Sequence, residues 1–160
     1  MAKLIAVVDD CPEFLPLVED LLTGDGYRVA TAYGQGQVAA RLRALRPHLL
    51  ILDLVLGQGE SGWDILEDVR REPDLAATPV ILCTADVLGI EARAAALRRH
   101  RDVAVLTKPF HIAEMQELVL GLIGRPEAGP PETRLGLVER GSVGRPRSTS
   151  ARVIPVAYSL

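Results

Sequence analysis

Long apolar runs are missing from this sequence of 160 residues. None approaches the roughly 20 residues that a membrane-spanning helix needs. The apolar segment Leu4–Val8 has five residues and ends on Asp9 and Asp10, not on the small residues of a signal-peptide cleavage site. We therefore expect a cytoplasmic protein without a membrane anchor.

Cysteine is scarce as well, since Cys11 and Cys83 are the two in the chain. The strand layout described below places another strand between them. Two strand spacings of about 4.8 Å exceed the roughly 7 Å limit on the Cα separation of a disulfide. We expect two free thiols, with Cys83 acting as a small buried apolar residue in an apolar strand.

Charge and composition divide the chain into two parts. Residues 1–124 carry 12 basic and 18 acidic side chains, whereas residues 125–160 carry six arginines and three glutamates. Proline and glycine make up 9 of these last 36 residues, and regular apolar spacing stops at about Arg125. Such a segment buries too little apolar surface to offset its ordering entropy. We predict one domain over residues 1–124 and a disordered, solvated tail over residues 125–160.

Short apolar runs in the first 124 residues alternate with longer stretches in which apolar residues recur every three to four positions. This alternation predicts βαβ units and a parallel sheet, hence a doubly wound α/β fold with helices on both faces. The predicted strands are Lys3–Val8, Tyr27–Ala32, Leu49–Leu52, Pro79–Cys83 and Val103–Leu106. The predicted helices cover about residues 12–23, 35–46, 63–71, 88–99 and 112–123.

Polar residues follow the carboxyl ends of four predicted strands. They are Asp9 and Asp10 after the first, Asp53 after the third, Thr84 after the fourth, and Thr107 and Lys108 after the fifth. In a doubly wound sheet, ligands bind outside these ends, where the strand order reverses. We expect these side chains to meet at one edge of the sheet.

Three carboxylates in one pocket, from Asp9, Asp10 and Asp53, repel one another unless a cation neutralises them. Oxygen ligands without a nearby cysteine or histidine favour a hard ion, and Mg²⁺ is the usual choice beside phosphates. Lys108 and Thr84 add an ammonium and a hydroxyl that can hold a phosphoryl group. The set predicts phosphoryl transfer to Asp53 as the in-line nucleophile.

Over about residues 3–123 this pattern resembles the response regulator receiver family, of which CheY is a member. The resemblance implies a strand order of 2-1-3-4-5 and phosphorylation of Asp53. It also implies that Asp10 and Asp53 bind Mg²⁺ directly, that Asp9 acts through a coordinated water, and that the backbone carbonyl of Val55 is a further ligand.

The same resemblance implies how the phosphoryl group is held. Lys108 would bind a phosphoryl oxygen, Thr84 would move toward it as the switch, and the Ala85 amide would donate as well. Pro109 is similar to the family's cis-proline, which fits the tolerance of X-Pro bonds for the cis form.

The implied function is two-component phosphorelay signalling by a stand-alone receiver, which is not a turnover enzyme. The donor would be a sensor histidine kinase, a phosphotransfer protein or a small phosphodonor. An unknown downstream protein would bind the face made by residues 88–99, 103–106 and 112–123. We expect a monomer or weak homodimer that binds neither DNA nor membranes.

Some positions depart from the family pattern. Val105 stands where an aromatic residue usually turns inward as the threonine moves, so we expect transmission through backbone shifts or weak transmission. Gly57 stands where proline is common, and one extra residue precedes Gly62, which predicts a more flexible loop. Val55 and Asp86 occupy positions that tune hydrolysis, and apolar Val55 suggests a slowly decaying phosphoryl form.

Other interpretations remain. Taken singly, the aspartates and Thr84 could be helix caps or turn residues. A phosphatase of the haloacid dehalogenase type needs a second Asp where Val55 stands. In a flavodoxin, phosphate-cradling amides would replace the acidic loop that begins at Asp9. A receiver-fold interaction module that works without phosphorylation is the main alternative.

Overall fold

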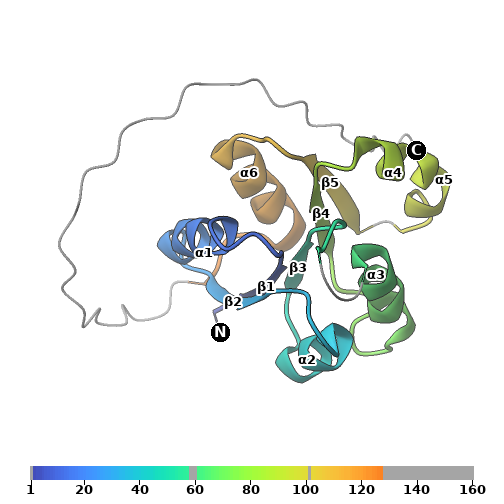
Figure 1. Ribbon diagram of the computed structural model, residues 1–160. Coiled ribbons are helices and arrows are strands. Elements are labelled where there is room, and N and C mark those ends of the chain that lie inside the picture. Colours follow the sequence, from blue (N-terminus) through green and yellow to red (C-terminus); the bar gives the residue numbers. More distant parts are fainter. Residues whose placement is uncertain (1, 58–60, 101, 128–160) are drawn as a thin grey trace.

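The computed structural model describes residues 2–57, 61–100 and 102–127. Five strands form one parallel sheet in the order β2-β1-β3-β4-β5 (Figure 1). The strands are β1 Leu4–Val8, β2 Arg28–Ala32, β3 Leu49–Leu52, β4 Val80–Thr84 and β5 Val103–Thr107. The predicted doubly wound fold and its strand order are confirmed.

The helices cover both faces of the sheet (Figure 1). They are α1 Phe14–Gly24, α2 Val38–Leu45, α3 Gly62–Arg71, α4 Val87–Ala92, α5 Ala94–Leu97 and α6 Ile112–Ile123. Helices α1 and α6 pack on one face through an apolar cluster that includes Leu15 and Met115. Helices α2, α3 and α5 pack on the other face, through a cluster that includes Leu42, Ile65 and Leu97.

The central strands explain why the sheet forms here. Every residue of β3 and β4 is buried, as expected for parallel strands that are covered by helices on both faces. Cys83 lies in β4, where burial raises the pKa of its thiol to about 12. This residue therefore behaves as the small buried apolar side chain that the sequence predicts.

The prediction of one continuous helix over residues 88–99 is wrong. The backbone of Arg93 leaves the helical region, with φ −108° and ψ 10°, and its N–H is shared between the carbonyls of Gly89 and Ile90. Gly89 weakens the helix before this point because glycine has low helix propensity. The predicted helix is therefore divided into two short helices, α4 and α5.

The ends of β4 and β5 lie one residue later than predicted. Thr84 and Thr107 pair with each other as the last residues of these strands. Thr84 is therefore held in the sheet and does not lie in the loop beyond it. Because Thr107 is paired with Thr84, the backbone of the next residue, Lys108, is held beside the end of β4.

The carboxyl end of α6 is hydrogen-bonded to residues at the edge of the sheet opposite to the one that carries the polar residues. Tyr27 donates its hydroxyl hydrogen to the Gly124 carbonyl over 2.9 Å, and the Lys3 ammonium contacts the Ile123 carbonyl. The predicted tail begins just beyond, and residues 128–160 lie outside the described residues, as do residues 58–60 of the loop predicted to be flexible. Among the described helices, none has both the length and the apolarity to cross a bilayer.

Candidate functional site

Asp9, Asp10 and Asp53 converge where β1 and β3 end. This is the point at which the strand order reverses, and it is where ligands bind in doubly wound sheets. Each aspartate offers one carboxylate oxygen, and these oxygens lie within 4.8 Å of one another. Asp9 and Asp53 are buried, whereas Asp10 is exposed. The structure thus brings together the three carboxylates that the sequence singles out.

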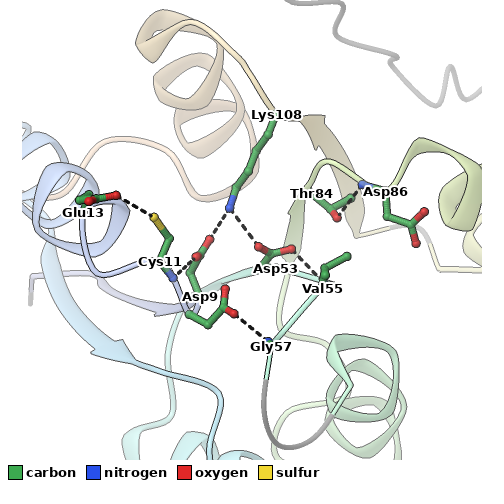
Figure 2. A network of polar contacts seen from close by, with 10 residues as sticks. Asp9, Cys11, Glu13, Asp53, Val55, Gly57, Thr84, Asp86 and Lys108 are labelled. Atoms are coloured by element: carbon green, nitrogen blue, oxygen red, sulfur yellow. Dashed lines mark hydrogen bonds and ion pairs between the residues drawn. The ribbon is translucent and has the colours of Figure 1, made fainter.

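Lys108 reaches into this cluster from the end of β5. Its Nζ lies 2.5 Å from Asp9 Oδ2 and 3.0 Å from Asp53 Oδ2 (Figure 2). Burial by itself lowers the pKa of Lys108, but hydrogen bonds and attraction to the two carboxylates outweigh it and raise the pKa above its ordinary value. Lys108 is therefore a permanent cation that bridges two of the three acids.

A backbone amide also holds each carboxylate. Asp9 Oδ1 accepts from Cys11 N–H over 2.8 Å, and Asp53 Oδ1 accepts from Val55 N–H over 2.9 Å (Figure 2). Burial raises the pKa of Asp9, although its hydrogen bonds to Lys108 and to Cys11 act in the opposite direction. The burial of Asp9 thus makes its charged form costly, and a cation in the cluster would lower that cost.

The set is chemically suited to a hard divalent cation. Three carboxylates face one ammonium, which leaves excess negative charge in a partly buried pocket. Oxygen donors of this kind are the ligands that Mg²⁺ prefers. Val55, whose carbonyl the family resemblance implies as a further ligand, lies in the loop directly after Asp53 and contacts that carboxylate through its amide.

Thr84 is buried at the end of β4, and its hydroxyl oxygen accepts a hydrogen bond from Asp86 N–H over 3.1 Å (Figure 2). Since a hydroxyl can accept and donate at once, its hydrogen stays available to an anion. Ala85 follows in the exposed loop. The Thr84 carbonyl accepts from Lys108 N–H over 2.9 Å, so two of the three predicted phosphoryl-binding residues are joined through their backbones.

A family profile described as the response regulator receiver domain matches residues 5–120. The chain belongs to the response regulator receiver family. Its receiver fold also carries the Lys108–Pro109 peptide bond in the cis form, which confirms that part of the predicted pattern.

Two of the chain's relatives are described as regulatory proteins. The chain is 32% identical over 138 residues to the DNA-binding response regulator MtrA of Mycolicibacterium smegmatis, covering 82% of this chain and 55% of MtrA. It is 34% identical over 113 residues to the nitrogen assimilation regulatory protein NtrX of Azorhizobium caulinodans, covering 69% of this chain and 24% of NtrX. The receiver chain thus spans about half of MtrA and about a quarter of NtrX.

One similar solved structure contains a metal. It is the receiver domain of the sensor histidine kinase PA1611 from Pseudomonas aeruginosa, with a magnesium ion coordinated in its active site cleft. The TM-score is 0.66 at 25% identity, over 78% of this chain and 99% of that one. Receivers of this fold therefore include one that binds Mg²⁺ in its cleft.

Sequence reasoning missed two features of this receiver site. The ring of Phe14, at the start of α1, lies 4.4 Å from Lys108 Nζ, within cation–π distance. The Gly57 N–H donates to Asp10 Oδ2 over 2.7 Å. Phe14 could have been noticed as an aromatic residue four positions beyond Asp10, whereas a backbone amide leaves no signal in residue type.

Proposed function

We propose that this receiver accepts a phosphoryl group on Asp53 in a Mg²⁺-dependent reaction and so acts as a switch in two-component signalling. The observation that carries the proposal is the bridge from Lys108 to Asp9 and Asp53 at the strand-order reversal. The donor would be a histidine kinase, a phosphotransfer protein or a small acyl phosphate. The protein makes one transfer to itself and is not a turnover enzyme.

Asp53 would be the nucleophile. One of its carboxylate oxygens bonds to phosphorus while the phosphorus–nitrogen bond of a phosphohistidine, or the phosphorus–oxygen bond to acetate in acetyl phosphate, breaks. The leaving imidazole or acetate keeps the electron pair. The Val55 amide and Lys108 hold the two carboxylate oxygens and fix the direction of attack.

The acidic residues would hold the metal. Asp10 and Asp53 are the proposed direct ligands together with the Val55 carbonyl, and Asp9 would act through a coordinated water. When bound, Mg²⁺ supplies positive charge that offsets the negative charge of the transferring oxygens. Support comes from the 4.8 Å grouping of carboxylate oxygens and from their excess over nearby ammonium groups.

Lys108, Thr84 and the Ala85 amide would bind the phosphoryl oxygens after transfer. Lys108 already lies 3.0 Å from the acceptor carboxylate, so it would meet the new group with little movement. Thr84 has to turn its hydroxyl hydrogen toward the anion. In doing so, its hydroxyl oxygen either keeps or loses the hydrogen bond that it accepts from Asp86 N–H. This choice would be the first step of the switch.

The downstream partner is proposed to bind the face made by α4, α5, β5 and α6. Val105 is buried in β5 and pairs with Leu82 in β4. Its small branched side chain has no second packing position comparable to that of an aromatic ring. A change at Thr84 would therefore reach this face through the β4–β5 backbone, where Thr84 holds Lys108.

Incubation with Mg²⁺ and acetyl phosphate tests the proposal through the intact mass of the protein. We expect an adduct of one phosphoryl group that requires the metal and disappears with EDTA. The control is the same incubation of Asp53→Ala, which should gain nothing. A wild-type protein that stays unmodified would instead favour an interaction module that works without phosphorylation.

The phosphoryl form is expected to decay slowly, over minutes or longer. Val55 is 56% exposed next to Asp53, and its apolar side chain offers an attacking water no hydrogen bond. Val55→Asn should shorten the lifetime several-fold. Loss of the adduct mass after donor removal measures both rates, and decay of the wild-type form within seconds would contradict the expectation.

A further inference from the structure

The exposed carboxylate of Asp10 is held by an amide from a different loop. Gly57 N–H donates to Asp10 Oδ2 over 2.7 Å, across a sequence separation of 47 residues. Lys108 contacts Asp9 and Asp53, whereas the hydrogen bond that the described residues give the Asp10 carboxylate comes from Gly57. This contact therefore connects the loop after β1 to the loop after β3.

Solvent reaches this contact. Asp10 and Gly57 line a polar hollow of about 570 Å³ together with Tyr33 and Gln35. An exposed carboxylate on a short side chain rotates freely unless a partner holds it, and ordering it on metal binding costs free energy. A fixed amide removes part of that cost beforehand, in the way that outer hydrogen bonds orient metal ligands.

A side chain at position 57 would displace the Asp10 carboxylate, whereas the backbone there would accept one. The φ of Gly57 lies outside the left-handed region, so an L-residue could adopt it. A Cβ at this position would lie 2.8 Å from Asp10 Oδ2, closer than a real Cβ approaches an oxygen. Alanine would push the carboxylate aside, and proline would in addition remove the N–H.

We infer that the Gly57 N–H is a positioning group for the metal ligand Asp10, fixing one carboxylate oxygen so that the carboxylate is set for Mg²⁺. The inference rests on the proposed Mg²⁺ site. Proline, which is common at this position in the family, has no N–H, so the contact is a feature of this chain that receivers with proline there lack. Removing such an outer hydrogen bond weakens metal binding by about 10–100-fold.

Isothermal titration of the full chain with MgCl₂ tests this inference without any phosphodonor. We expect the Kd for Mg²⁺ to rise by about 10-fold or more in Gly57→Pro, and by less in Gly57→Ala, which keeps the donor but displaces Oδ2. The matched control is Gly121→Ala in α6, where an added Cβ meets no atom within 4 Å. It should bind Mg²⁺ as the wild type does.

A second measurement does not depend on how the Gly57 variants fold. In the amide NMR spectrum of the metal-free protein, Asp10→Ala should shift the Gly57 N–H resonance and speed its hydrogen exchange, because the acceptor is gone. An unchanged Gly57 resonance, or folded Gly57 variants with wild-type Mg²⁺ affinity, would overturn this inference but not the proposed metal site. A wild-type protein that binds no Mg²⁺ would overturn the proposed metal site as well.

Discussion

Replacing Lys108 with methionine is expected to slow phosphorylation of Asp53 by about 10²–10³-fold, the usual effect of removing one preorganised donor from the reacting oxygens. Lys108 lies 3.0 Å from the acceptor carboxylate and is partly buried, so water cannot replace it at full strength. Methionine would put an apolar group in place of the ammonium that lies beside the Phe14 ring. The adduct mass, followed over time with acetyl phosphate, gives the rate.

Mg²⁺ affinity separates this effect from misfolding. The Lys108 ammonium competes with a cation for Asp9 and Asp53, so Lys108→Met should bind Mg²⁺ at least as tightly as the wild type. The raised pKa of Lys108 keeps the group charged through neutral pH, so its titration should leave no inflection in the wild-type rate there. A Lys108→Met protein that phosphorylates at the wild-type rate would contradict the assigned role.

Gly62→Ala is expected to destabilise the fold by about 1–3 kcal/mol, the usual cost of forcing extra atoms into a packed site. A Cβ at Gly62 would lie 2.2 Å from the Asp53 carbonyl oxygen and 2.5 Å from the Leu54 Cα. Both contacts are to backbone, which cannot rotate away. Relief requires the segment that carries Asp53 to move, so phosphorylation should fall together with stability.

Urea unfolding of the wild type and both glycine variants measures this effect. Gly121→Ala is the control, because its Cβ meets no atom within 4 Å and alanine is favoured over glycine inside a helix by roughly 0.5–1 kcal/mol. The two substitutions should therefore shift stability in opposite directions. Equal stability of Gly62→Ala and wild type would mean that Asp53 and Gly62 are not packed as described.

The site could be predicted from the sequence because parallel strands bring their carboxyl ends to one edge. Once Leu49–Leu52 is recognised as a buried strand, Asp53 must stand at that edge, and the same holds for Asp9 beside it. The carboxylates of these residues then predicted the kind of chemistry at that edge. No comparable rule places Phe14 over Lys108, since that contact depends on where α1 begins after the loop.

The break between α4 and α5 also could not be predicted from local spacing. Apolar and alanine-rich residues over 88–99 are compatible with one helix, and Gly89 weakens that helix without fixing where it ends. The guanidinium of Arg93 lies 4.3 Å from the Trp63 ring of α3, and this position is where the helical hydrogen bonding changes. The Gly57 amide was hidden for a different reason, because every non-proline residue carries an N–H.

Locating the phosphoryl group is the most direct test of the account. Borohydride reduces an aspartyl phosphate to the corresponding alcohol, so peptide mass spectrometry of the treated protein identifies the acceptor. We expect homoserine in place of Asp53 in the wild type and no conversion when Mg²⁺ is withheld. Conversion at another residue, or a phosphoryl adduct that survives Asp53→Ala, would contradict it.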